Sequence, residues 1–200
     1  MTAMPAMNHV SAQEQLIRRI RKEREVSPRS PFIAAIDGRC GAGKTTLAVC
    51  AAEMLGAPLI HMDDFFLRPE QRSPERLARP GENIDHERFL EEVLIPLSEG
   101  RECAYRPFSC FRGELGEPVT VEHGGLVLVE GSYAHHPALT PYYGLRIFLT
   151  VSPEEQLRRI RARNGESMAE VFRDRWIPLE EKYFSAFHIQ ESADLTLSLP

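Results

Sequence analysis

Residues 31–46 read PFIAAIDGRCGAGKTT, and this stretch decides the fold of the chain. Its first part is a short apolar run that is typical of a buried strand. Residues 38–45 match the pattern G-x-x-x-x-G-K-[ST], and a helical stretch follows over about 44–55. Glycines let the backbone curl so that successive N–H groups point inward, and the helix adds its positive N-terminal end. The stretch therefore predicts a cradle for phosphate groups.

The cradle indicates ATP and Mg2+ as cofactors. Lys44 is expected to reach the β- and γ-phosphates and to assist transfer, and the Thr45 hydroxyl is expected to coordinate magnesium. Cys40 lies near a helix N-terminus, where a thiol pKa can be lowered, so its oxidation is one hypothesis and a purely steric role is the other. The residues expected to bind the nucleotide are Gly38, Arg39, Cys40, Gly41, Ala42, Gly43, Lys44, Thr45 and Thr46.

Apolar runs that predict strands alternate with patterns that predict helices along the rest of the chain. Strands are expected at 31–37, 58–63, 125–131, 144–151 and 193–199, and short ones in ECAYRPF and PVTVEH, with GELGE as a turn between them. Helices are expected at 11–25, with Ser11 as N-cap, at 86–100, at 152–165 and over about 167–188. Such alternation predicts a parallel sheet with helices on both faces.

The predicted fold is α/β: a three-layer sandwich of the P-loop NTPase class with a mostly parallel five-stranded sheet. A helical lid is expected around 158–170. Residues 1–200 are interpreted as one domain, of which 1–10 are expected to be mobile. Ligands of such sheets bind at the carboxyl ends of the strands, so polar residues at those ends are the candidates for chemistry.

Carboxylates follow two of the predicted strands. Asp63 and Asp64 stand in HMDDFF, and because neighbouring side chains of a strand point to opposite faces, only one should face the nucleotide. We choose Asp63, as general base on the acceptor hydroxyl or as a ligand near magnesium; the alternative is a solvated surface pair. Glu130 ends the apolar run GLVLVE, where a carboxylate is costly unless it meets a cation. Glu130 and Thr45 are therefore the predicted metal ligands.

Four arginines crowd the helix expected at 152–165. They are Arg158, Arg159, Arg161 and Arg163, and a solvated charged face is the alternative to a lid over the phosphates. Arg159 and Arg163 are four residues apart and share a face, so these two are chosen as catalytic. No N-K-x-D motif for reading guanine is present, and a motor ATPase usually has a longer chain. A small-molecule kinase fits best.

The motifs IDGRCGAGKTT, HMDDFF, NIDHERF, LVLVEGSY and the arginine helix, in this order, resemble the uridine kinase family and its relatives. These relatives include nicotinamide riboside kinase and phosphoribulokinase. The resemblance extends from about residue 32 to the final predicted strand. It implies that Asp63 is the catalytic base, that Asp85 holds ribose hydroxyls, that Glu130 lies near magnesium and that Tyr105 contacts the base.

The resemblance thus implies transfer to the 5′-hydroxyl of a nucleoside such as uridine. However, the residues after Tyr105 are RPFSC, without the histidine by which uridine kinases read the pyrimidine. The alternatives are a kinase for nicotinamide riboside, pantothenate or a sugar phosphate, or a regulatory ATP-binding protein without transfer activity. Trp176 is interpreted as a core residue.

Composition and charge indicate which classes of partner the chain can bind. The chain has 200 residues, 42% of them hydrophobic, and a net charge of -5, which disfavours nucleic acid as a partner. No signal peptide or membrane-spanning run is visible, so a cytoplasmic location without membrane contact is expected. Four scattered cysteines and several histidines show no common metal-ligand spacing. The expected partner is a small-molecule acceptor, with homo-oligomer formation left open.

Overall fold

A five-stranded parallel sheet forms the centre of the computed structural model, which describes residues 9–199. The strand order is β2-β7-β1-β8-β9, and each neighbouring pair is parallel. The strands are β1 (Phe32–Gly38), β2 (Leu59–His61), β7 (Leu126–Glu130), β8 (Leu145–Thr150) and β9 (Leu195–Ser198). The expected α/β architecture is confirmed.

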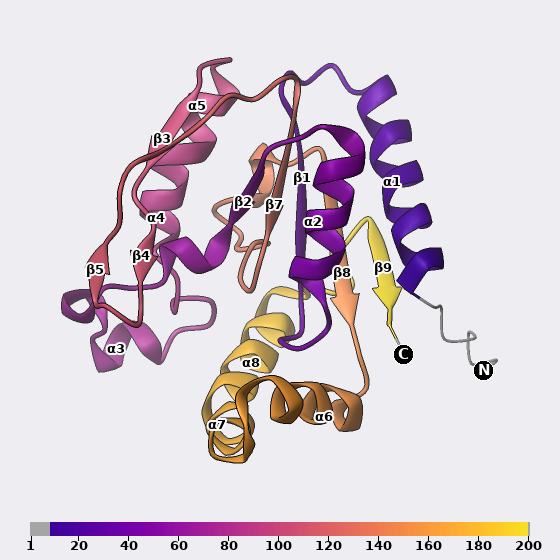
Figure 1. Ribbon diagram of the computed structural model, residues 1–200. Helices are drawn as coiled ribbons and strands as arrows, with labels where there is room; N and C mark the ends of the chain where they lie inside the picture. The colour runs from indigo at the N-terminus through magenta and orange to yellow at the C-terminus, as the bar shows by residue number, and fades with distance from the viewer. Residues whose placement is uncertain (1–8, 200) are drawn as a thin grey trace.

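Helices α1 (His9–Val26) and α2 (Lys44–Leu55) cover one face of the sheet (Figure 1). Leu16 and Ile20 of α1 are fully buried there, against alternate residues of β1 such as Phe32 and Ile36. The helix begins at His9, so Ser11 lies inside it and the prediction of Ser11 as N-cap was wrong. Of the segment expected to be mobile, residues 1–8 lie outside the described part and residues 9–10 belong to α1.

The other face of the sheet is covered by a helical run and by the C-terminal helix. The run consists of α4 (His86–Phe89), the π-helical turn η3 (Leu90–Leu94) and α5 (Ile95–Ser98), and it ends before Gly100 as predicted. Phe89, Val93 and Leu97 are fully buried with Ile33 and Ala35 of β1. Because the residues of β1 alternate between the two faces, the apolar strand joins two cores into three layers.

Two small antiparallel pairs lie beside this sandwich. β3 (Cys103–Tyr105) pairs with β6 (Val119–Val121), as the two predicted short strands suggested. Between them, β4 (Phe108–Ser109) pairs with β5 (Glu114–Leu115). The segment GELGE therefore contains a strand, and the prediction of a simple turn there was incomplete. Three short helical turns lie between β2 and α4, namely η1 (Met62–Phe65), η2 (Pro69–Gln71) and α3 (Pro74–Leu77). A fourth, η4 (Thr140–Tyr142), lies between β7 and β8.

The helices after β8 gather at the carboxyl edge of the sheet, which is the lower edge in Figure 1. They are α6 (Pro153–Asn164), α7 (Glu166–Val171), the π-helical turn η5 (Phe172–Trp176) and α8 (Ile177–Phe187). The Ser152 side chain caps α6 by accepting from the N–H of Glu155, as the sequence predicted. The expected lid residues 158–170 fall on the end of α6 and most of α7. Among residues 9–199, no helix is both long and apolar enough to cross a membrane.

Candidate active site

A cavity of about 490 Å³ opens at this carboxyl edge. One wall is the glycine-rich loop with the start of α2, and the lid helices adjoin it. A second wall comes from η1, the segment that follows it as far as Asn83, and Cys110 from the β4–β5 hairpin. The end of β7 and the residues just after it also line the cavity. Segments distant in sequence thus meet where parallel sheets bind ligands.

The glycine-rich loop has the backbone that its sequence predicts. Gly38 has a φ of 138°, and a Cβ there would stand 2.0 Å from the carbonyl oxygen of Leu149, so only glycine fits. Lys44 is buried, and its Nζ donates to the carbonyl oxygens of Gly38 (2.6 Å) and Arg39 (3.2 Å) and approaches Ser132 Oγ at 3.4 Å. The lysine is therefore held ready inside the loop.

Most of the residues expected to bind the nucleotide line the cavity. They are Cys40, Gly41, Gly43, Lys44, Thr45 and Thr46. Gly38 and Ala42 belong to the loop but do not line the cavity. The Arg39 side chain turns away and pairs with Glu181 through a 2.7 Å contact from its Nε.

The two predicted metal ligands stand side by side. Thr45 Oγ1 lies 3.3 Å from both carboxylate oxygens of Glu130. A hydroxyl beside a carboxylate at the end of a phosphate cradle suits Mg2+, which prefers oxygen ligands. His61 was missed by the sequence reasoning: its Nδ1 lies 2.6 Å from Glu130 Oε1, and this hydrogen bond raises the pKa of His61.

Asp63 and Asp64 point in different directions, although not for the reason expected. Both lie in the 3-10 turn η1 rather than on a strand, so the alternation argument does not apply. Asp63 lines the cavity, and desolvation by the surrounding protein raises its pKa despite its access to solvent. Asp64 accepts a hydrogen bond from Tyr105 at 3.2 Å instead. Asp63 is thus the carboxylate available to an acceptor.

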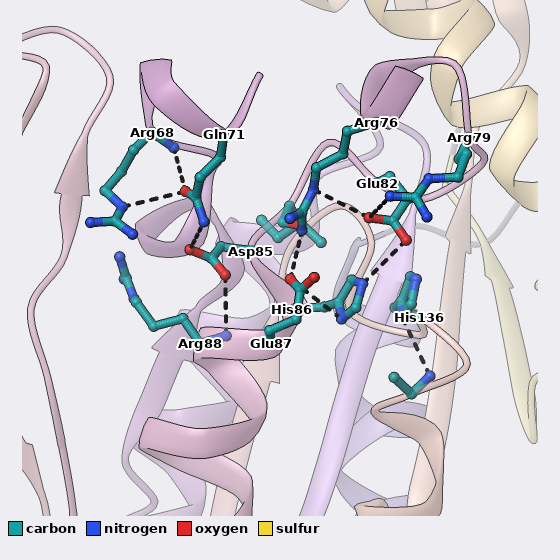
Figure 2. Close-up of polar contacts among 12 residues, drawn as sticks. Arg68, Gln71, Arg76, Arg79, Glu82, Asp85, His86, Glu87, Arg88 and His136 are labelled. Atoms are coloured by element: carbon teal, nitrogen blue, oxygen red, sulfur yellow. Dashed lines mark hydrogen bonds and ion pairs between the residues drawn. The ribbon is translucent and has the colours of Figure 1, made fainter. Parts of the chain in front are cut away.

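The two residues assigned to a nucleoside by the resemblance do not line the cavity. The carboxylate of Asp85 caps α4 by accepting from the backbone N–H of Arg88 (3.2 Å), and it also accepts from Gln71 Nε2 (2.7 Å), as Figure 2 shows. Tyr105 is buried, and its ring packs 4.9 Å from that of Phe65. In this structure both side chains lie outside the cavity lining and contact residues of η1 and η2, Asp85 through Gln71 and Tyr105 through Phe65.

The arginine helix divides as its spacing predicts. Arg159 and Arg163 line the cavity, and Arg159 Nη1 lies 3.3 Å from the carbonyl oxygen of Gly41. Arg158 instead pairs with Glu155, and Arg161 pairs with Glu166. One face of α6 therefore lines the cavity.

Other residues at the cavity were missed or misread. Trp176, interpreted as core, lines the cavity with Arg175 stacked 4.5 Å from its ring centroid. Glu180 is buried and accepts from the N–H of Cys40 (3.0 Å) and from Ser132 Oγ (2.7 Å). The sequence did contain a signal that Glu180 is buried. Glu180 lies on the same i, i+3, i+4 stripe of α8 as the buried Tyr183 and Phe184.

The thiol of Cys40 does not have the lowered pKa considered from the sequence. Burial is the largest cause that raises its pKa far above the ordinary value, and the nearby Glu180 carboxylate raises it further. Since the thiolate is the reactive form, oxidation of Cys40 is disfavoured and the steric role is supported.

Glu82, His86 and His136 bring potential ligand atoms within 4.8 Å of one another. The two imidazole rings are stacked, with centroids 4.0 Å apart and planes 13° from parallel. Lone pairs in parallel planes do not converge on one ion, so the arrangement is a ring stack rather than a metal centre. Figure 2 shows Glu82 reaching His86 on one side and two arginines on the other.

No protein-family model matches the chain. Among curated proteins, it is 31% identical over 179 residues to the tRNA-specific adenosine deaminase subunit tad2 of Schizosaccharomyces pombe, and covers 43% of that protein with 82% of its own length. It is 29% identical over 147 residues to a cytidylate kinase of Pyrobaculum arsenaticum, covering 66% of that protein with 71% of its own length. The chain therefore spans less than two thirds of these relatives.

A solved structure from Bacillus stearothermophilus, described as a possible uridine kinase, matches with a TM-score of 0.63 at 17% identity. The match covers 92% of this chain and 96% of that one. The chain thus has the fold of a uridine kinase-like P-loop protein, as the resemblance implied.

Proposed function

We propose that the protein is an ATP-dependent kinase that transfers the γ-phosphoryl group to a hydroxyl of a small molecule. One observation carries the proposal: the phosphate loop with Lys44, the Thr45–Glu130 pair and the carboxylate of Asp63 all open into the same cavity. These are the parts that phosphoryl transfer requires, namely a phosphate cradle, a metal position and a base for the acceptor.

In the proposed reaction, Asp63 accepts the proton of the acceptor hydroxyl as its oxygen attacks the γ-phosphorus. The bond to the bridging oxygen breaks, and ADP leaves. Lys44 and the lid arginines offset the charge on the moving phosphoryl group. Thr45 and Glu130 would hold Mg2+, which when bound neutralises charge on the β- and γ-phosphates. Closure of α6 and α7 would exclude water, which limits hydrolysis of ATP.

A nucleoside is the second, finer candidate for the acceptor. The aromatic rings of Phe66, Tyr133 and Trp176 at the cavity favour it, because they offer surfaces for a base. Asp85 and Tyr105 would have to turn toward the cavity to act as the resemblance implies. The sequence does not support the deaminase activity named for one relative, because its four cysteines form no C-x-x-C pair for a deaminase zinc.

ADP release from Mg-ATP should be measured with and without an acceptor. The panel should contain uridine, cytidine, nicotinamide riboside, pantothenate, glycerate and ribulose 5-phosphate. Stimulation by one acceptor, with its phosphorylated product seen by mass spectrometry, is the expected result. ATP binding without stimulation by any acceptor would favour the regulatory alternative.

A further inference from the structure

Arg72 is an exposed residue that lines the cavity from the segment between β2 and α4. The same segment also contributes Phe66, Leu77 and Asn83 to the lining, and the β4–β5 hairpin contributes Cys110. None of these belongs to the phosphate loop or to the lid. Nothing in the proposed phosphoryl transfer therefore uses the positive charge of Arg72.

The side chain of Arg72 is anchored but not neutralised. Its Nε donates to the carbonyl oxygen of Leu67 at 2.9 Å. Its Nη2 has only a weak contact, 3.9 Å to the sulfur of Cys110. Within residues 9–199, no carboxylate lies within ion-pair distance of this guanidinium. One edge of the planar group is thus fixed while the other remains available.

The neighbouring arginines are different. Arg68 pairs with Glu70, Arg76 with Glu82 and Glu87, and Arg88 with Glu92. Figure 2 shows part of this network, which surrounds α4 and leaves its arginines occupied. Arg72 stands outside the network and is the member of the group that lines the cavity.

We propose that Arg72 binds an oxyanion carried by the acceptor, so that the substrate is a hydroxy compound with a phosphate or carboxylate group. This inference rests on the proposed kinase function. A guanidinium fork fixed at Nε is suited to bidentate contact with either anion. The acceptor then spans the cavity, with its hydroxyl at Asp63 and its anionic group at Arg72. A neutral nucleoside would leave the positive charge of Arg72 without a counter-charge.

Cys110 provides a report of binding that does not depend on catalysis. It is exposed, lines the cavity and touches Arg72, whereas the half-buried Cys50 lies on α2, away from the lining. The rate of alkylation of each cysteine should be followed by peptide mass spectrometry at constant ionic strength. The probes are glycerol 3-phosphate and glycerate, with glycerol as the neutral counterpart, and Cys50 is the internal control.

We expect the anionic probes to slow alkylation of Cys110 by about tenfold at ten times their Kd, and glycerol to have no effect. The protection should disappear in Arg72→Gln and weaken in Arg72→Lys, which keeps the charge without the fork. Arg112→Gln is the matched control, because Arg112 lies on the β4–β5 hairpin close to Cys110 but does not line the cavity. It should retain full protection. Equal protection by glycerol, or protection that survives in Arg72→Gln, would overturn the proposal.

Turnover separates this proposal from the proposed function. With an anionic acceptor, Arg72→Gln should raise the acceptor KM by about 10–100-fold and leave the KM for ATP unchanged. Preferred turnover of a neutral nucleoside, unaffected by Arg72→Gln, would refute the anion site and leave the kinase standing. Protection of Cys110 without turnover of any acceptor would support the anion site and refute the kinase.

Discussion

The two walls of the cavity are built in different ways. The nucleotide wall is backbone: a glycine loop whose N–H groups and lysine are set by the strand before it and the helix after it. The acceptor wall consists of side chains on short turns between β2 and α4 and on the β4–β5 hairpin, whose strands have two residues each. These turns are supported by polar contacts such as the one between Asp85 and Gln71.

The difference indicates how each wall can change. The nucleotide wall depends on φ angles that only glycine adopts easily, so its geometry tolerates few substitutions. The acceptor wall depends on which side chains stand on its turns, so its specificity can change while the fold stays the same. Substitutions in either wall should therefore lower the rate of catalysis. Only substitutions in the acceptor wall should change which acceptor is preferred.

The largest effect is expected at Asp63, which lines the cavity from η1. Asp63→Asn removes the proposed base while keeping the size of the side chain, so kcat should fall about 10²–10⁴-fold with little change in ATP binding. Asp64→Asn is the matched control, because Asp64 faces Tyr105 and not the cavity. Steady-state kinetics and ATP titration measure both. Equal losses in the two variants would mean that Asp63 acts only through the local structure.

The lid side of the nucleotide wall should give the next largest effect. Arg163→Gln removes a cation that lines the cavity, and we expect kcat/KM for ATP to fall by about 10²-fold. Arg161→Gln removes the same charge from the same helix, but its side chain pairs with Glu166 outside the lining. If both variants lose activity equally, the arginines act through the overall charge of the helix and not through a contact in the cavity.

The sequence predicted the nucleotide wall well because the determinants of that wall are local. A strand, a glycine turn and a helix N-terminus follow one another within residues 32–55, and each has its own pattern. The strands of the confirmed sheet were predictable for the same reason. The pairing of Glu130 with a hydroxyl at Thr45 followed from the rule that the carboxyl ends of parallel strands converge.

The acceptor wall was predicted less well because contacts distant in sequence decide it. Whether Asp85 faces a ligand depends on Gln71, and the direction of Tyr105 depends on Asp64. Outside that wall, Trp176 lines the cavity from the π-helical turn η5. No local pattern encodes these arrangements. The apolar stripe of α8 did, however, indicate that Glu180 is buried.

Support of the acceptor wall should be sensitive to acid. Burial is the main cause that lowers the pKa of His136 to about 4, and the stacked His86 and Arg76 lower it further while Glu87 opposes them. Glu82 also lies close to the ring pair. The folded protein thus keeps His136 neutral between pH 6.5 and 4, while the unfolded chain binds a proton in this range. Folding stability should therefore fall as the pH drops through it.

Urea unfolding of the wild type at pH 7 and pH 5 should show a loss of about 2 kcal/mol from this residue. His136→Gln should lose correspondingly less between the two pH values. His86→Gln should keep most of the loss, since burial rather than the neighbouring ring is the largest cause. The same pH dependence in wild type and His136→Gln would show that the acid sensitivity arises elsewhere.

The smallest effect concerns the support of the nucleotide wall. The buried carboxylate of Asp37, at the end of β1, accepts hydrogen bonds from the N–H groups of Gly38 (2.7 Å) and His135 (2.9 Å) and from the hydroxyl of Tyr183 (2.9 Å). Tyr183 belongs to α8, so this last bond ties the lid side to the sheet. Tyr183→Phe should lower the free energy of unfolding by about 1 kcal/mol, because it removes one of the three donors to Asp37 and leaves the other two in place.

Tyr143→Phe is the matched control for this bond. Tyr143 is also buried, but its hydroxyl has no hydrogen-bond partner among the described residues. Its removal should leave stability unchanged or raise it slightly, because an unsatisfied hydroxyl is costly in the core. Urea unfolding at neutral pH compares the two variants directly. Equal effects would mean that the bond to Asp37 adds nothing beyond packing, and the nucleotide wall would then depend on its backbone alone.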